Sequence, residues 1–246
     1  MQKSISAELT GDTPDFPVEE RVSTPTIPSY LEETYWWAYL HPNGVRIFER
    51  QWLVNLILWG NYAKLRDSVL AEIGKQASGR TLQVACVYGD FTQKLTERLA
   101  PTARLDVVDV APIQLDNLRR KIGAQRNVFL DRQNAAELAF ADGSFDQVVV
   151  FFLLHELPGD VRTRAVREVL RVLKPGGRAV FVDYHRPVWQ HPHRYIMQPI
   201  LKTLEPFALD MWNTEIVAWI SPGNAPAKVE KSTFFGGLYQ KVVMTR

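Results

Sequence analysis

Short apolar runs alternate with helix-like segments from residue 79 onwards. The runs that predict strands are 81–86, 104–110, 128–130, 145–154 and 178–183, and the segments that predict helices are 91–100, 114–122, 160–173 and 214–220. This alternation is typical of a parallel sheet with crossover helices. Two further β-rich runs, 229–235 and 238–245, flank Gly236-Gly237 and predict a hairpin at the end of the chain.

The segment 30–70 is helix-like and rich in Trp and Tyr, with a break at 41–44 where the sequence reads His-Pro-Asn-Gly. We expect two helices there, forming a helical cap over 29–78 ahead of a catalytic domain over 79–246. Aromatic residues at helical spacing usually pack into a core. The alternative is a surface that contacts lipid, because Trp and Tyr flanked by Arg and Lys suit the membrane–water boundary. Residues 1–28, with several acids and prolines, are expected to form a flexible tail.

Composition narrows the class of protein only modestly. The chain has 246 residues, 46% of them hydrophobic and 23% charged, as expected for a globular domain with a full core. A formal net charge of +2 is too small to indicate nucleic-acid binding. The single cysteine, Cys86, excludes an internal disulfide and is expected to pack in the core. With no signal-peptide pattern and no run of about 18 apolar residues, a cytoplasmic protein is expected, with peripheral membrane contact through the N-terminal helices as an option.

Ligands of open α/β sheets bind at the carboxyl ends of the strands. Asp109 ends the second predicted strand, where a carboxylate can accept hydrogen bonds from ribose hydroxyls. The run 134–146, Asn-Ala-Ala-Glu-Leu-Ala-Phe-Ala-Asp-Gly-Ser-Phe-Asp, and the run 170–178, Leu-Arg-Val-Leu-Lys-Pro-Gly-Gly-Arg, together resemble the class I methyltransferases that use S-adenosylmethionine (SAM). The resemblance implies a Rossmann-like α/β fold with a seven-stranded, mostly parallel sheet and an antiparallel last strand. It also implies that Asp109 binds the SAM ribose and Asn134 the adenine.

The first strand-end loop departs from that family. An acidic residue and a glycine-rich turn are usual there, because the backbone must approach the methionine part of SAM closely. Here Gln83 stands at the acid, Ala85 and Val87 stand at two glycines, and Gly89 remains. One interpretation is an inactive relative that has lost the ligand. The other is that the amino-acid end of SAM is bound differently. With neutral Gln83 in place of the acid, the α-amine of SAM would be less protonated and therefore a better nucleophile.

A closer resemblance covers most of residues 28–246. The run 87–92, Val-Tyr-Gly-Asp-Phe-Thr, with the segments 28–43 and 235–241, resembles the rhodoquinone biosynthesis family (RquA). The resemblance implies conversion of ubiquinone to rhodoquinone, with SAM donating the amino group that replaces a ring methoxy group and Mn²⁺ as the metal. The implied SAM-binding residues are Gln83, Ala85, Val87, Tyr88, Gly89, Asp109, Val110, Asn134, Ala135 and Phe152.

The remaining strand ends offer metal ligands and acid–base groups. His155 follows the fourth strand, and Asp183-Tyr184-His185 end the fifth. Imidazole and carboxylate ligands suit Mn²⁺, so His155, Asp183 and His185 are the candidate ligands. Tyr88, Tyr184 and His185 are the candidate catalytic groups.

Two other functions fit the same sequence. One is an ordinary SAM-dependent methyltransferase acting on a small lipophilic acceptor, with Val87 and Tyr88 merely reshaping the pocket. The other is a SAM-binding or quinone-binding module without catalytic activity. The residues alone leave all three open.

Overall fold

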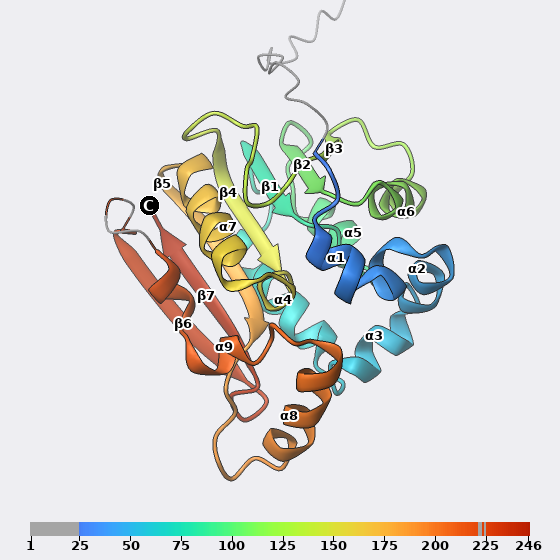
Figure 1. Cartoon of the computed structure of the whole chain (residues 1–246). Helices are drawn as coiled ribbons and strands as arrows, with labels where there is room; N and C mark the ends of the chain where they lie inside the picture. The colour runs from blue at the N-terminus through green and yellow to red at the C-terminus, as the bar shows by residue number, and fades with distance from the viewer. Residues whose placement is uncertain (1–24, 221–222, 224) are drawn as a thin grey trace, which may run out of the picture.

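The computed structural model describes residues 25–220, 223 and 225–246, so most of the predicted tail over 1–28 lies outside the described residues. Its centre is a seven-stranded sheet in the order β3-β2-β1-β4-β5-β7-β6 (Figure 1). The strands are β1 (Arg80–Val84), β2 (Arg104–Asp109), β3 (Val128–Arg132), β4 (Phe145–Phe151), β5 (Leu173–Tyr184), β6 (Lys228–Phe234) and β7 (Tyr239–Thr245).

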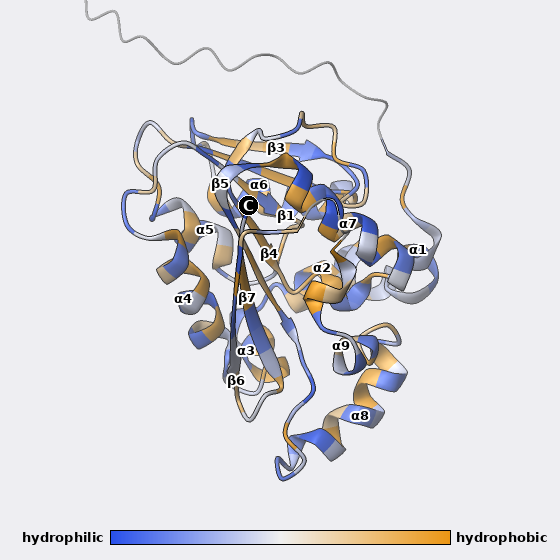
Figure 2. Ribbon diagram, turned by 90° about the vertical axis from the view of Figure 1, so that its left-hand side faces the viewer, coloured by the Kyte–Doolittle hydropathy of each residue, from blue (hydrophilic) through white to orange (hydrophobic). Residues whose placement is uncertain are grey.

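Strands β1 to β5 pair in parallel, whereas β7 is antiparallel to both β5 and β6. The predicted Rossmann-like fold, with its mostly parallel sheet and C-terminal hairpin, is therefore confirmed. Strand β4 reads Phe-Asp-Gln-Val-Val-Val-Phe, and its Val residues are fully buried because helices cover both faces of the sheet. Figure 2 shows α4 (Tyr62–Ile73) and α5 (Phe91–Thr96) on one face and α7 (Gly159–Val172) on the other.

The carboxyl ends of the parallel strands meet the rest of the chain. In Figure 1 the arrowheads of β4 and β5 point towards the side where the N-terminal helices and α8 lie. The helices of that side are α1 (Ser29–Thr34), the π-helical turn η1 (Trp36–Leu40), α2 (Pro42–Phe48), α3 (Gln51–Ile57) and α8 (His193–Leu204). Helix α6 (Pro112–Ile122) packs on β2 and β3, and the short turns η2 (Leu154–Glu156), α9 (Asp210–Asn213) and η3 (Ile216–Trp219) complete the described chain.

The N-terminal segment differs from the two helices expected. The predicted break at 41–44 is the start of α2: Pro42 occupies its first turn, and His41 Nδ1 accepts a hydrogen bond from the backbone N–H of Asn43 at 3.2 Å. A side chain at Gly44 would overlap the carbonyl of Trp37. Gly44 therefore allows α2 to pack directly on η1. The region consists of several short helices instead of two longer ones.

The C-terminal segment also differs. The predicted helix 214–220 is only a 3₁₀ turn, η3. Helix α8 has no counterpart among the predicted helices, because Pro199 interrupts its pattern. Within the described residues, no helix has the length and apolar character needed to cross a bilayer.

Candidate functional site

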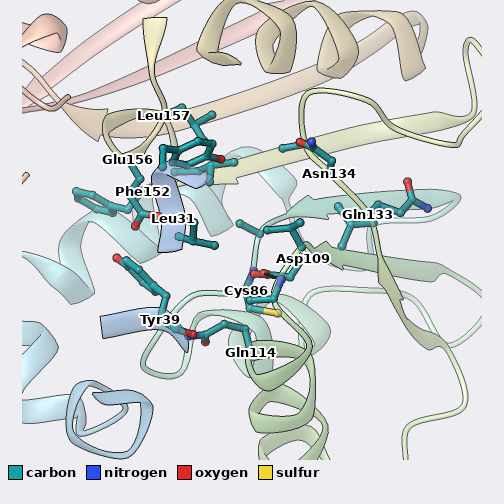
Figure 3. A pocket seen from close by; sticks show the side chains of 17 residues that line it. Leu31, Tyr39, Cys86, Asp109, Gln114, Gln133, Asn134, Phe152, Glu156 and Leu157 are labelled. Atoms are coloured by element: carbon teal, nitrogen blue, oxygen red, sulfur yellow. Dashed lines mark hydrogen bonds between the residues drawn. The ribbon is translucent and has the colours of Figure 1, made fainter. Parts of the chain in front are cut away.

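Two adjoining chambers lie at the carboxyl ends of the strands. The first chamber is lined by Tyr30, Leu31, Tyr39, Ala85, Cys86, Val108, Asp109, Val110, Ala111, Gln114, Gln133, Asn134, Ala135, Phe152, Leu153, Glu156 and Leu157 (Figure 3). The second chamber is lined by Trp37, Ala38, Tyr39, Phe48, Val54, Ile57, Leu58, Tyr62, Cys86, Val87, Tyr88, Phe151, Phe152, His155, Glu156, Tyr184 and Glu205. Four residues line both, namely Tyr39, Cys86, Phe152 and Glu156, and we call them the shared wall.

Asp109 is held in a fixed position in the first chamber. Its Oδ2 accepts the backbone N–H of Cys86 and its Oδ1 accepts that of Ala111, both at 2.8 Å. Burial raises the pKa of Asp109 to about 6, although these two backbone donors partly oppose the rise. The carboxylate is thus ionised at neutral pH and available to hydroxyl donors in the chamber.

The first chamber also contains Asn134, which was predicted to bind the adenine, with two further predicted SAM-binding residues. Val110, Asn134 and Ala135 line it, and Figure 3 shows Asn134 across the chamber from Phe152 and Glu156. Asn134 Oδ1 accepts the backbone N–H of Ala136 at 2.9 Å, which fixes the orientation of the amide. The structure therefore brings Asp109, Val110, Asn134, Ala135 and Phe152 into one cavity.

The loop after β1 keeps a glycine-like conformation without the glycine. Ala85 has φ of +70°, a left-handed conformation that costs an L-residue about 1–2 kcal/mol. The Gln83 side chain stabilises this conformation of the loop. Its Nε2 donates to the Ala85 carbonyl at 3.0 Å, and its Oε1 accepts from Thr92 Oγ1 at 2.9 Å. Gln83 is fully buried and lines neither chamber, so it supports the loop instead of facing a ligand.

The next three residues of the loop have separate positions. Val87 and Tyr88 line the second chamber, whereas Gly89 lines neither. Gly89 has φ of +82°, and a Cβ there would lie 2.7 Å from the Tyr62 hydroxyl. The Tyr88 hydroxyl donates to the Ala38 carbonyl at 2.6 Å and accepts from Gln114 Nε2 at 2.8 Å, which ties the loop to η1. Burial raises the pKa of Tyr88, so this phenol stays protonated.

A buried ion pair underlies the second chamber. His155 Nδ1 lies 2.9 Å from Asp183 Oδ1, and Asp183 also accepts the backbone N–H groups of Leu154, His155 and Tyr184. Burial alone would lower the pKa of His155, but the charge and hydrogen bond of Asp183 raise it to about 9. His155 is therefore a cation at neutral pH, and Asp183 is committed to holding it and the turn after β4.

Two carboxyl groups complete the second chamber, and neither was among the residues predicted from the sequence. Burial raises the pKa of Glu156 to about 8, against the opposing effect of His155, and burial also raises the pKa of Glu205. Glu156 Oε1 lies 3.8 Å from His155 Nε2. Glu156 could have been found from its place beside His155, whereas Glu205 follows α8 and no local pattern marks it. Glu156 belongs to the shared wall and can accept or donate a proton there.

Two predicted catalytic groups, Tyr184 at the end of β5 and His185 directly after it, lie in different surroundings. Tyr184 lines the second chamber with its ring edge-on to His155 at 4.9 Å, and burial raises its pKa. His185 lines neither chamber: its Nδ1 lies 2.8 Å from the Gly237 carbonyl and its Nε2 lies 2.9 Å from Lys231 Nζ. Successive residues of a strand point to opposite faces, which separates these two side chains.

The predicted manganese ligands do not form a site. His155 and Asp183 are paired to each other, and His185 is held at the hairpin. Among residues 25–220, 223 and 225–246, no group of three or more His, Cys, Asp or Glu side chains is arranged to hold a metal ion. The described arrangement does not bring His155, Asp183 and His185 together as ligands of one metal ion: both carboxylate oxygens of Asp183 accept backbone N–H groups, and one of them also pairs with His155.

Comparison with known proteins agrees with the architecture. Residues 81–177 match the family described as "Methyltransferase domain". The match covers this central part of the chain only, and the architecture of the described residues is the Rossmann-like fold that solved methyltransferases also have.

Individual relatives and solved structures are similar to this chain over part of its length. The demethylmenaquinone methyltransferase of Staphylococcus aureus (strain JH9) is 33% identical over 135 residues, which is 55% of this chain and 55% of that relative. The chain thus matches about half the length of this curated relative. The solved structure of the mitomycin 7-O-methyltransferase MmcR has a TM-score of 0.64 at 16% identity, covering 87% of this chain and 61% of that one. The N-methyltransferase NodS from Bradyrhizobium japonicum WM9, in complex with S-adenosyl-l-homocysteine, has a TM-score of 0.51 at 18% identity, covering 74% and 86%.

Proposed function

We propose that this chain binds SAM in the first chamber and transfers a group from it to a lipophilic quinone-type acceptor in the second. The observation that carries the proposal is the shared wall, because a cofactor in one chamber and an acceptor in the other would meet at Tyr39, Cys86, Phe152 and Glu156. The similarity to a demethylmenaquinone methyltransferase supports an acceptor of this class.

Each chamber has chemistry suited to its proposed ligand. In the first, Asp109 would accept the ribose hydroxyls and Asn134 would meet the adenine. The methionine part would lie along the backbone of Ala85 and Cys86, where the left-handed turn brings the chain close. The second chamber is walled mainly by aromatic and aliphatic side chains, which suit a flat ring with an apolar tail.

Methyl transfer is the reaction that the relatives support. The sulfonium methyl moves to a ring carbon or hydroxyl of the acceptor, S-adenosylhomocysteine is released, and the acceptor loses one proton. Glu156 is suited to take that proton, because a carboxyl group with a pKa near 8 exchanges protons readily around neutral pH. The His155 cation beside it would stabilise negative charge on an acceptor oxygen.

A second reaction, replacement of a ring methoxy group by the SAM amino group, is favoured by one observation. The residue at the position of the usual acid, Gln83, is neutral and turned under the loop, so no carboxylate on this strand keeps the α-amine protonated. The amine nitrogen would attack the methoxy-bearing carbon, and methanol would leave with one proton from nitrogen. Loss of the Cα proton would then pass two electrons to the quinone ring and leave an imine, which water would hydrolyse to the amino-substituted hydroquinone and the α-keto acid of the SAM skeleton; reoxidation of the hydroquinone gives the aminoquinone. The Glu156 acid would donate a hydrogen bond to the adjacent ring carbonyl.

The deciding experiment is mass spectrometry of the quinone fraction after incubation with SAM and a short-chain quinone, in oxidised or reduced form. Asp109→Asn serves as the cofactor-chamber variant, and Glu32→Gln, on the exposed face of α1, as the matched control. A product heavier by one methylene establishes methyl transfer. A product lighter by the difference between methoxy and amino, carrying nitrogen from amine-labelled SAM, establishes amination. Tight SAM binding without any product from either form would overturn the proposal in favour of a binding module.

A further inference from the structure

Helices α3 and α8 come from distant parts of the chain but meet at one corner. The Trp59 ring, just after α3, lies edge-on to His193 at 4.3 Å between centroids, and its Nε1 donates to Met197 Sδ at 3.1 Å. In Figure 1 both helices lie at the lower end of the molecule, away from β3. We group the exposed apolar side chains of α3, Trp59 and α8 under one name, the α3–α8 face, and define it as Trp52, Leu56, Ile57, Trp59, Ile196, Ile200 and Leu204.

The α3–α8 face is apolar and open to solvent. Trp52 and Leu56 are each 62% exposed. On α8 the internal contacts are made by Met197 and Leu201, which are buried, while Ile196, Ile200 and Leu204 recur every four residues on an exposed stripe. A helix that buries one apolar side and exposes a second is expected where another apolar phase covers the second. The preceding loop adds Trp189, which is 68% exposed.

The face is continuous with the mouth of the second chamber. Trp37 and Ile57 both line that chamber, yet they are 37% and 41% exposed. They are therefore rim residues, and the opening lies beside the exposed side chains of α3. A molecule covering the face would also cover this entrance.

The two chain segments that carry the face have formal charges of one sign. Neither the segment 50–66, which contains α3, nor the segment 185–204, which contains α8, has an Asp or Glu. Exposed cations in these segments include Arg50, Lys64, Arg186 and Lys202. Aromatic and aliphatic side chains edged by cations match the interface of a bilayer with anionic headgroups.

We propose that the α3–α8 face docks on an anionic lipid bilayer and holds the mouth of the second chamber at the membrane surface. A lipophilic acceptor then enters from the lipid without crossing water. This entry route rests on the proposed function, whereas the docking itself does not. The protein lies on the membrane, consistent with the lack of a spanning helix among its described residues.

Co-sedimentation of the full chain with vesicles tests the docking. Vesicles of phosphatidylcholine with phosphatidylglycerol are compared with pure phosphatidylcholine, using wild type, Trp52→Ser, Ile200→Ser and Lys202→Gln. The expected result is binding to the anionic vesicles, weakened on the order of tenfold by each apolar substitution and about fivefold by loss of the lysine charge. Val229→Ser is the matched control, since Val229 is exposed on β6 outside this face and should leave binding unchanged.

Two further readouts separate docking from catalysis. Activity with a short-chain, water-soluble acceptor should be the same in all four variants and wild type, because none of the substituted residues lines either chamber. A wild type that binds the vesicles but shows no activity would count against the proposed function and leave the docking proposal standing. Equal binding by wild type and both apolar variants would overturn the docking. The docking would also be overturned if the wild type forms a dimer without vesicles and the apolar variants abolish that dimer, because a second copy would then cover the face.

Discussion

Glu156 gives the sharpest test, because its burial predicts opposite effects on stability and activity. Its pKa rises from the ordinary 4.5 to about 8 in the folded chain, where its side chain is 12% exposed. The folded state therefore holds a proton that the unfolded state releases between these values, so the free energy of unfolding falls as pH rises from 4.5 to 8. Below pH 4.5 both states are protonated and the group costs nothing.

The magnitude follows from the size of the pKa change. At about 1.4 kcal/mol per pH unit, the displacement from 4.5 to about 8 corresponds to about 5 kcal/mol above pH 8 and about 3 kcal/mol at pH 7. The substitution Glu156→Gln keeps the shape and a hydrogen-bond donor but cannot ionise. It should therefore remove most of this loss and stabilise the protein at pH 8 by several kcal/mol, with little change at pH 4.5.

Activity should move the other way. Proton transfer by a positioned side chain contributes about 10²–10⁴-fold to a rate, so Glu156→Gln should lower kcat by at least about 100-fold. The assay is urea unfolding followed by circular dichroism at pH 4.5, 7 and 8.5, alongside turnover with SAM and a short-chain quinone. Glu33→Gln, exposed on α1, is the control and should change neither quantity. Equal pH dependence of stability in Glu156→Gln and wild type would refute the reasoning.

Four further predictions test the rest of the site. Asp109→Asn should weaken SAM binding, measured by calorimetry, on the order of tenfold; in the wild type the affinity should fall below pH 6, where the carboxylate becomes protonated. Asp183→Asn should lower the pKa of His155 from about 9, seen by NMR titration, and destabilise the fold by about 3–5 kcal/mol, since it leaves a buried cation without its partner. Ala85→Gly should preserve the fold and SAM affinity and change the free energy of unfolding by no more than about 1 kcal/mol, because relief at φ of +70° is offset by a freer unfolded chain. Gly89→Ala should instead cost at least about 1–2 kcal/mol in urea unfolding, because its φ is +82° and the added Cβ has no space.

Sequence patterns predicted the sheet well, because the parallel strands contain short runs of buried apolar residues, such as Val148–Val150 in β4, separated by helix-like segments. The same patterns placed Asp109 at a strand end on the cofactor side, whereas Asn134 was predicted from the family resemblance; both residues line the first chamber. Helix α8 was not predicted, because Pro199 interrupts it and much of its apolar side faces outward. No internal packing rule requires such a stripe.

The acceptor side could be predicted only in part, for a different reason. Residue type and strand position suggested that His155, Asp183 and His185 bind one metal ion, but the direction of each side chain is set by tertiary contacts. Asp183 is drawn to the backbone of the turn after β4, and His185 to the hairpin. Glu205 lines the second chamber from the residue directly after α8, a helix that no local pattern predicted.

The shared wall means that the two ligands cannot be thermodynamically independent. Tyr39, Cys86, Phe152 and Glu156 each present one surface to either chamber, and Phe152 does so from a left-handed backbone with φ of +55°. Any ligand that shifts these side chains alters the affinity of the other chamber, and by linkage the factor is the same in both directions. A substitution in the wall must therefore be characterised as a cycle of four binding constants, because one constant measured alone would assign a joint effect to a single ligand.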